Sequence, residues 1–206
     1  MTPIDGLWRG KAPLLLASES PARRALLAAA GIPFESVATH IDERALEAPL
    51  REEGAGAATI AAHLARAKAL AVSGLDRLVV GADQILSLDG EVFAKPRDVD
   101  EAKAQLARLS GRSHELHSAL CVARAETVLF ETVARATLTC RKFSPEFIDR
   151  YVAAASASVL ASVGAYQIEG LGVHLFERIE GDHATILGLP LIPLLAFLRQ
   201  EGSLVG

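Results

Sequence analysis

The sequence predicts an α/β fold built on a mixed β-sheet. Half of the 206 residues are hydrophobic, which is enough for a sizeable core without metal or disulfide staples. Short apolar runs typical of strands lie among longer segments with helical composition and periodicity. Because the two kinds of segment do not alternate strictly, a mixed sheet is favoured over a doubly wound parallel one.

The first strand and the first helix are joined by a polar segment. The run "PLLLAS" at 13–18 is typical of a buried strand, and residues 20–31 follow it as a helix. Ser20 is expected to cap this helix, Pro21 to fill its first position and Gly31 to end it.

The later elements follow from the same signals. A strand that ends in acids is expected at 34–43, and a helix at 56–73. Asp89-Gly90, a dipeptide that favours a tight turn, predicts a hairpin over 77–96. The remaining expectations are helices at 98–111, 144–155 and 189–202, strands at 114–125 and 127–143, and a glycine-punctuated strand region at 164–181.

Composition narrows the class of protein. The net charge of −4 gives no basic field that would attract nucleic acid. No apolar run is long enough to span a bilayer, and Cys121 and Cys140 fit no zinc or redox spacing. We therefore expect one cytoplasmic domain over residues 1–206, in the form of two closely joined lobes, with no nucleic-acid or membrane partner.

The start of the first helix is a candidate anion site. A helix N-terminus presents free N–H groups and a positive dipole end, and Arg23 and Arg24 add planar forks suited to phosphate. Ser18 adds a hydroxyl donor. The alternative is a capped surface helix with two solvated arginines, and this segment taken alone favours that alternative.

Asp83 is a candidate catalytic acid because it lies within the apolar run "VVGADQIL". A carboxylate there is costly unless it is paired, binds a metal or faces a cleft. The alternative is an acid on an exposed strand end. Hairpin pairing about Asp89-Gly90 would bring Lys95 near Asp83. Lys68 lies on a predicted helix, where a lysine is usually solvated.

The acids of "HIDER" are candidate metal ligands. Asp42 and Glu43 are expected at a strand end, where together with Asp83 they could hold a divalent cation, or where they simply face water. Basic groups for phosphates and acids for a cation together suit metal-assisted cleavage of a phosphoanhydride bond.

Several blocks of the sequence resemble those of one family. "LASESPARRALLAAAG", "VVGADQ", "GEVFAKPRD", "LSGRSHELHSAL" and "GAYQIEGLG" occur in the order found in the Maf nucleoside triphosphate pyrophosphatases. The resemblance covers about residues 14–198. It implies an elongated mixed β-sheet flanked by helices, with a nucleotide cleft between two lobes, as in inosine triphosphate pyrophosphatases.

The resemblance also implies an activity and a site. The expected reaction is hydrolysis of a nucleoside triphosphate to the monophosphate and pyrophosphate, with Mg or Mn as the cofactor. The resemblance also implies a cytoplasmic protein that can form a homodimer. Asp83 matches the family's proton acceptor, and Glu43 matches an acid that helps to bind the cation with it. The residues that match the phosphate path are Ser18, Ser20, Arg23, Lys68 and Lys95.

Three positions bear on which nucleotide base the protein accepts. Gln84 and Glu169 resemble the branch of the family that acts on 7-methyl-GTP, whereas Ala22 stands where that branch usually carries tryptophan. We expect a house-cleaning enzyme that removes a modified nucleotide such as 7-methyl-GTP. The alternatives are a dTTP and UTP pyrophosphatase of the same family, a nucleotide-binding regulator of cell division with little turnover, and a plain phosphatase.

Overall fold

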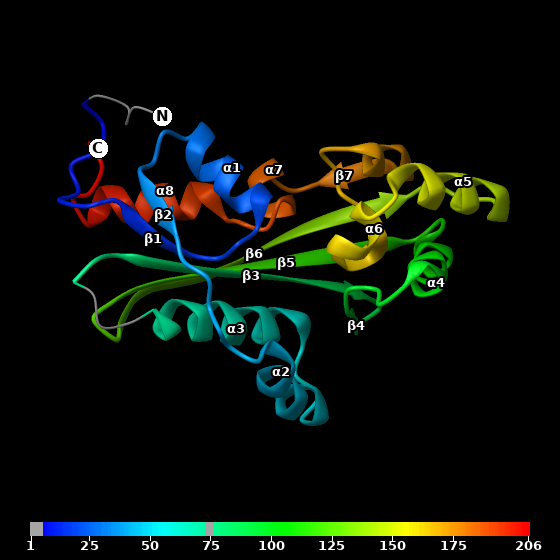
Figure 1. The fold of residues 1–206 in the computed structure, drawn as a ribbon, viewed down its shortest axis with the longest axis horizontal. Helices are drawn as coiled ribbons and strands as arrows, with labels where there is room; N and C mark the ends of the chain where they lie inside the picture. Colours follow the sequence, from blue (N-terminus) through cyan, green and yellow to red (C-terminus); the bar gives the residue numbers. More distant parts are fainter. Residues whose placement is uncertain (1–5, 73–75) are drawn as a thin grey trace. The chain divides into compact units, whose positions relative to one another are not determined.

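The computed structural model describes residues 6–72 and 76–206 (Figure 1). It contains a seven-stranded sheet in the order β2-β1-β3-β5-β6-β7, with β4 paired to β3. Some pairs are parallel and others antiparallel, so the predicted mixed sheet is confirmed. The chain divides into two compact units: unit 1 comprises residues 1–84, 118–134 and 183–206, and unit 2 comprises residues 85–117 and 135–182.

The first strand of unit 1, β1, is buried on both faces. In β1 (Leu14–Ala17), Leu14 and Leu16 pack with the core that includes residues of α8, whereas Leu15 and Ala17 pack with Val79 in a separate cluster. This alternation follows from the two-residue period of a strand. β1 runs parallel to β2 (Phe34–Ser36) and to β3 (Val79–Leu88), as expected for strands that are joined through helices.

Helices cover the two faces of the strands in unit 1. Figure 1 shows α3 on one face and α1 and α8 on the other. α1 begins after Ser20, whose side chain accepts a hydrogen bond from the Arg23 N–H, and it is followed by Gly31 with a positive φ of 68°. The start and the end predicted for α1 are therefore confirmed. The bounds of the three helices are Pro21–Ala29 for α1, Ala57–Ala71 for α3 and Leu191–Gln200 for α8.

The strand expected at 34–43 is wrong beyond Ser36. Residues Glu43–Glu52 form a helix, α2, and Asp42 caps it by accepting a hydrogen bond from the Ala45 N–H at 3.1 Å. None of its residues is buried, and Pro49 lies inside it. The segment is rich in charged residues and contains a proline, which ordinarily marks the end of a helix, so the sequence did not predict a helix here.

Unit 2 contains the paired part of the hairpin and two of the predicted helices. β4 (Glu91–Phe93) pairs antiparallel with β3 around Asp89 and Gly90, both at positive φ, so the predicted turn is confirmed. The pairing ends at Leu86 and Phe93 and does not extend to Lys95, so the hairpin is shorter than expected. The helices predicted at 98–111 and 144–155 are confirmed as α4 (Val99–Leu109) and α5 (Pro145–Ala155).

The two long strands that enter both units are also confirmed. β5 (Ser113–Arg124) and β6 (Thr127–Cys140) are neighbours in the sheet. Ala125 and Glu126 join them, and both have positive φ, as in a two-residue hairpin turn.

The strand region expected at 164–181 is mostly not a strand. Two 3₁₀ turns, η1 (Val163–Ala165) and η2 (Leu171–Leu175), fill much of it, and only β7 (Phe176–Glu180) is extended. Gly164 has a φ of 77°, a value that a strand cannot accommodate. The short helices α6 (Ser158–Ala161) and α7 (His183–Ile186) complete the fold. In the described part of the chain, no helix is both long and apolar enough to cross a membrane.

Candidate functional site

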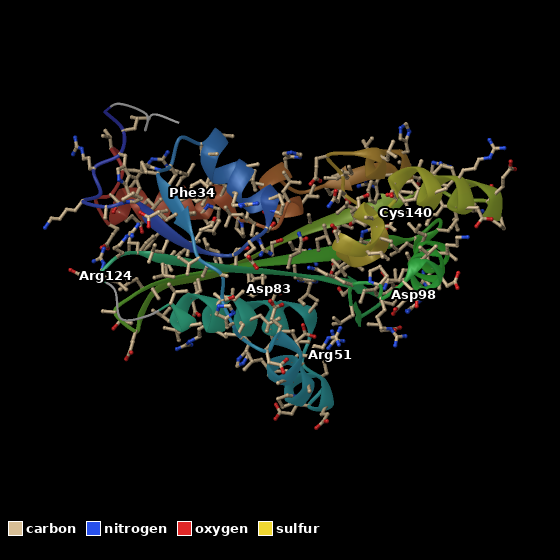
Figure 2. The ribbon with its side chains drawn as sticks, viewed as in Figure 1. Phe34, Arg51, Asp83, Asp98, Arg124 and Cys140 are labelled. Carbon is tan, nitrogen blue, oxygen red and sulfur yellow. The ribbon has the colours of Figure 1, made fainter. Side chains whose placement is uncertain are left out.

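A buried acid and a buried lysine face each other in unit 1. Asp83 lies on β3 on the side covered by α3 (Figure 2), and its Oδ1 lies 2.5 Å from the Nζ of Lys68. The Lys68 ammonium also lies 3.0 Å from Oε1 of Glu43 at the start of α2. Both side chains of the buried pair are 8% exposed, whereas that of Glu43 is 48% exposed. Two carboxylates, one on α2 and one on β3, therefore meet the ammonium of Lys68 on α3.

Gly81 explains how α3 comes close enough to β3 for this contact. A Cβ at Gly81 would lie within 3 Å of the Ala65 carbonyl oxygen and of the Ala69 backbone nitrogen. The absence of a side chain lets helix and strand backbones approach, and Lys68 lies on the helix between those two residues. The space beside Gly81 is thus filled by α3.

The polar segment after β1 forms a second part of the site. Ser18 Oγ accepts hydrogen bonds from the Ser20 N–H at 3.2 Å and from Nη1 of Arg23 at 3.2 Å. The Ser20 hydroxyl caps α1 by accepting from the Arg23 N–H at 3.4 Å. The two predicted serines and the first arginine therefore form one connected group, whereas Arg24 is exposed.

A backbone carbonyl fixes the guanidinium of Arg23. Its Nε donates to the Gly188 oxygen at 2.7 Å, from a turn that follows α7. Arg23 is half-buried, and burial lowers its pKa, against the charges of Asp83 and Glu43, which raise it. Arg23 therefore interacts electrostatically with Asp83 and Glu43.

Burial and charge act in opposite directions on Asp83. Desolvation raises the pKa of this carboxyl, while the cations of Lys68 and Arg23 oppose that effect, and the pKa remains above its ordinary value. A carboxylate with a raised pKa is a better proton acceptor than an ordinary one, because its pKa lies nearer to neutral pH.

The acids present fit a divalent cation that also binds phosphate. Glu43 and Asp83 both reach the one Lys68 nitrogen, so their oxygens converge on a common region. Among the described residues, no cluster of three or more His, Cys, Asp or Glu side chains could hold a metal ion. Two carboxylates with phosphate oxygens and water as the other ligands are a set that Mg²⁺ accepts.

The remaining predicted residues lie in different places. Ala22 is half-buried in the first turn of α1, and Gln84 follows Asp83 on β3 with its amide directed to the backbone of α7. Lys95 and Glu169 are exposed residues of unit 2, two residues after the end of β4 and just before η2. Their participation stays a prediction.

Two contributors were missed in the sequence. The Gly188 carbonyl holds Arg23, and the Ser118 hydroxyl contacts both Gln84 and the Thr185 carbonyl. A glycine in "ILGLPL" signals a turn, but no pattern indicates which side chain its carbonyl accepts.

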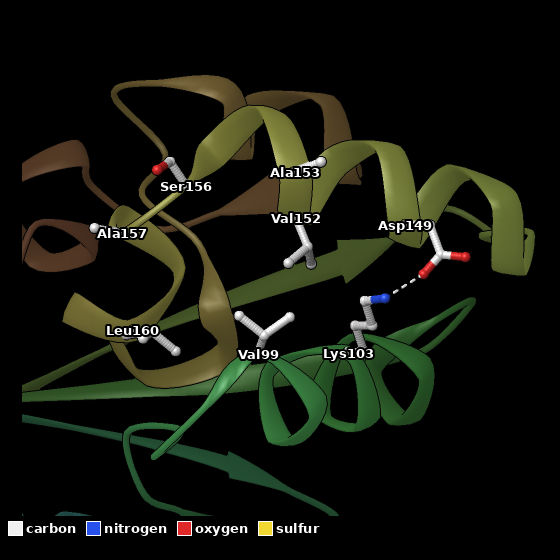
Figure 3. A pocket seen from close by; sticks show the side chains of 8 residues that line it. All are labelled: Val99, Lys103, Asp149, Val152, Ala153, Ser156, Ala157 and Leu160. Atoms are coloured by element: carbon white, nitrogen blue, oxygen red, sulfur yellow. Dashed lines mark ion pairs between the residues drawn. The ribbon is translucent and has the colours of Figure 1, made fainter.

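A groove in unit 2 carries no comparable chemistry. Its volume is about 390 Å³, and its walls between α4 and α5 are mainly apolar, with Val99, Val152 and Leu160 among them (Figure 3). Its charged groups, Lys103 and Asp149, already pair with each other at 2.5 Å. The two charged groups of this groove are therefore paired with each other, and Ser156 adds only a hydroxyl.

The arrangement in unit 1 can be compared with known proteins. The model of the family described as Maf-like protein matches residues 13–201. The chain belongs to the Maf family. A 7-methyl-GTP pyrophosphatase of Rhizobium meliloti (strain 1021) is 52% identical over 193 residues, which cover 93% of this chain and 97% of that protein.

Other Maf relatives carry a broader name. A nucleoside triphosphate pyrophosphatase of Bradyrhizobium diazoefficiens is 52% identical over 198 residues, covering 95% of this chain and 97% of that protein. Such names confirm the prediction that this Maf protein is an enzyme, a hydrolase. A solved dITP/XTP pyrophosphatase of Mycobacterium abscessus aligns with a TM-score of 0.43 at 17% identity, over 92% of this chain and 95% of that one, which is too slight a likeness to carry an argument.

Proposed function

We propose that this Maf protein hydrolyses a nucleoside triphosphate to the nucleoside monophosphate and pyrophosphate. The observation that carries the proposal is the cluster of Asp83, Lys68 and Glu43 in unit 1, electrostatically coupled to Arg23. Acids for a cation and a water, together with cations for phosphate oxygens, are what this reaction needs. The names of the relatives supply the substrate class.

Each residue has a part in the proposed reaction. Asp83 accepts a proton from the attacking water, and its raised pKa suits that role. Arg23 and Lys68, with the hydroxyls of Ser18 and Ser20, bind the phosphate oxygens, and Lys95 of unit 2 is proposed for the same role from the resemblance alone. Charge on these groups offsets the negative charge that builds up on the phosphates.

Mg or Mn is the proposed cofactor, and Glu43 and Asp83 would hold it. A bound cation would neutralise charge on the triphosphate and fix its orientation. While the site holds no triphosphate, Lys68 keeps both carboxylates paired, which limits the cost of burying Asp83.

The favoured substrate is a modified nucleotide such as 7-methyl-GTP. Relatives of similar identity carry either the 7-methyl-GTP name or the general one, so the names alone do not choose the base. Gln84 and Glu169 favour 7-methyl-GTP through the resemblance. Ala22 lacks the ring that could stack on a cationic base, and an Ala22→Trp variant should therefore raise the preference for 7-methyl-GTP.

One assay tests the proposed reaction. The purified protein is incubated with Mg or Mn and with 7-methyl-GTP, GTP, UTP or dTTP, and both products are identified. We expect monophosphate plus pyrophosphate, with the highest kcat/KM for 7-methyl-GTP. Release of inorganic phosphate alone would indicate a plain phosphatase. Saturable binding without turnover would indicate a regulator, and a preference for UTP and dTTP would indicate the other branch.

A further inference from the structure

The side-chain amide of Gln84 donates hydrogen bonds to the backbone of α7. Gln84 follows Asp83 on β3, so its side chain points to the opposite face of the strand. Its Nε2 lies 2.9 Å from the Ile186 oxygen, 3.1 Å from the Thr185 oxygen and 2.9 Å from the Ser118 hydroxyl. An amide nitrogen has two N–H donors, and here three protein acceptors surround it.

Ser118 completes this contact from the neighbouring strand, β5. Its hydroxyl donates to the Thr185 oxygen at 2.7 Å, so its only hydrogen is used and its oxygen is left to accept from Gln84. Two side chains thus converge on the last carbonyls of a four-residue helix. A helix this short has little stability of its own, so its position depends on such contacts.

The turn after α7 connects this contact to Arg23. Gly188 donates its N–H to the Thr185 oxygen at 3.0 Å and has a φ of 90°. Its own oxygen accepts from Nε of Arg23 at 2.7 Å, and a Cβ at this position would lie 3.3 Å from Nε and Nη2 of Arg23. The same short turn is therefore held by Gln84 and Ser118 at one end and contacts the guanidinium at the other.

We propose that Gln84 and Ser118 are positioning residues that orient Arg23 through the Gly188 carbonyl. The inference rests on the proposed role of Arg23 in phosphate binding. The Nε hydrogen bond fixes the plane of the guanidinium, which leaves its Nη atoms to meet phosphate oxygens in a set direction. Both N–H groups of the Gln84 amide are used inside the protein, so its amide nitrogen supports the turn that holds Arg23.

The experiment measures phosphate binding apart from base recognition and turnover. Isothermal titration with inorganic pyrophosphate is carried out on the wild-type protein, Gln84→Leu, Ser118→Ala, Arg23→Lys and the Gln84→Leu/Arg23→Lys double variant. Gln200→Leu, which changes an exposed glutamine of unit 1, is the matched control. Circular dichroism and thermal unfolding establish which variants fold. If Gln84→Leu does not fold, Ser118→Ala provides the test.

The proposal predicts coupling between the two side chains. Gln84→Leu should weaken pyrophosphate binding about tenfold and Ser118→Ala about threefold, and the Gln84 change should have no further effect once Arg23 is lysine. KM for 7-methyl-GTP and KM for UTP should both rise, because both substrates carry the phosphates that Arg23 is proposed to bind. The control should bind as the wild type does.

Opposite results overturn the proposal. These are unchanged pyrophosphate affinity in folded Gln84 and Ser118 variants, additive effects with Arg23→Lys, a changed preference between 7-methyl-GTP and UTP at constant pyrophosphate affinity, or no pyrophosphate binding by the wild type. The proposed function is judged separately by turnover. If the Gln84 and Arg23 substitutions are coupled but no triphosphate is turned over, the proposed function is rejected and this inference stands. If triphosphate is turned over but the two substitutions are not coupled, the inference is rejected and the proposed function stands.

Discussion

At the scale of single residues, Asp83 is the group on which the chemistry depends. It is buried, its pKa is raised by desolvation, and its carboxylate is oriented by Lys68. An Asp83→Asn change keeps the shape and an oxygen that can accept from Lys68, but it removes the proton acceptor. We expect kcat to fall about 100-fold or more, because general base catalysis contributes roughly that factor.

The Asp83→Asn prediction is checked by steady-state kinetics beside circular dichroism and thermal unfolding. The matched control is Asp76→Asn, an exposed acid of the same unit, which should leave kcat unchanged. A folded Asp83→Asn protein with near-normal kcat would remove Asp83 from the role of proton acceptor.

His114 is a residue that makes stability depend on pH. It is 1% exposed in unit 2, its Nε2 lies 2.8 Å from the Tyr166 hydroxyl, and burial lowers its pKa from 6.5 to about 4. Between these two values the unfolded chain binds a proton that the folded protein does not. The stabilisation is therefore present above pH 6.5 and is lost as the pH falls towards 4, by about 3 kcal/mol at most.

A variant at His114 isolates this contribution. Chemical unfolding at several pH values should show a smaller loss of stability between pH 7 and pH 4 in His114→Gln than in the wild-type protein. His174→Gln changes an exposed histidine of the same unit and should keep the wild-type pH dependence. Equal pH dependence in all three proteins would contradict the prediction.

At the scale of elements, Gly81 determines how closely α3 packs on β3. A Cβ there would overlap backbone atoms of Ala65 and Ala69, which cannot move as a side-chain end can. We expect Gly81→Ala to lower the free energy of unfolding by about 3 kcal/mol and to raise KM, because α3 also carries Lys68. Denaturant titration and kinetics measure the two effects.

A second glycine serves as the control for Gly81. Gly56 precedes α3 at a φ of −71°, and a Cβ there would meet nothing within 4 Å. Gly56→Ala should change stability by less than about 1 kcal/mol, since no backbone has to move. If both variants had the same stability, close packing at Gly81 could not be what positions α3.

The elements that were predicted from sequence are those with a buried face or with clear end signals. α1 has Ser20, Pro21 and Gly31 at its ends, and the hairpin has Asp89-Gly90. α2 was missed because it has no buried residue and contains Pro49. The 3₁₀ turns around Gly164 were mistaken for a strand, since a glycine pattern does not show where φ becomes positive.

At the scale of the whole molecule, the sequence indicated which residues matter better than how they meet. Lys68 taken alone suggested a solvated lysine. It is buried because Gly81, which has no side chain, lets α3 pack closely on β3. Arg23 and Arg24 are adjacent, yet only the first is fixed by a carbonyl 165 residues further along the chain. Contacts over such separations depend on tertiary packing, which spacing along the chain does not encode.

Ligand binding should stabilise the whole molecule in a metal-dependent way. Linkage predicts about 2.7 kcal/mol at a ligand concentration of 100 times Kd, which corresponds to a rise in Tm of roughly 5–10 °C for a chain of this size. We expect this rise in Tm with Mg and a non-hydrolysable triphosphate, and a much smaller rise when EDTA replaces Mg.

Two variants of α2 test whether Glu43 holds the cation. Glu43→Gln, which can still accept from Lys68, should lose the difference between Mg and EDTA, whereas Glu52→Gln, at the far end of the same helix, should keep it. Differential scanning fluorimetry measures both variants, and equal stabilisation with Mg and with EDTA in the wild-type protein would exclude a cation from the complex, because a ligand set shared by Glu43, Asp83 and phosphate oxygens requires the metal for full affinity.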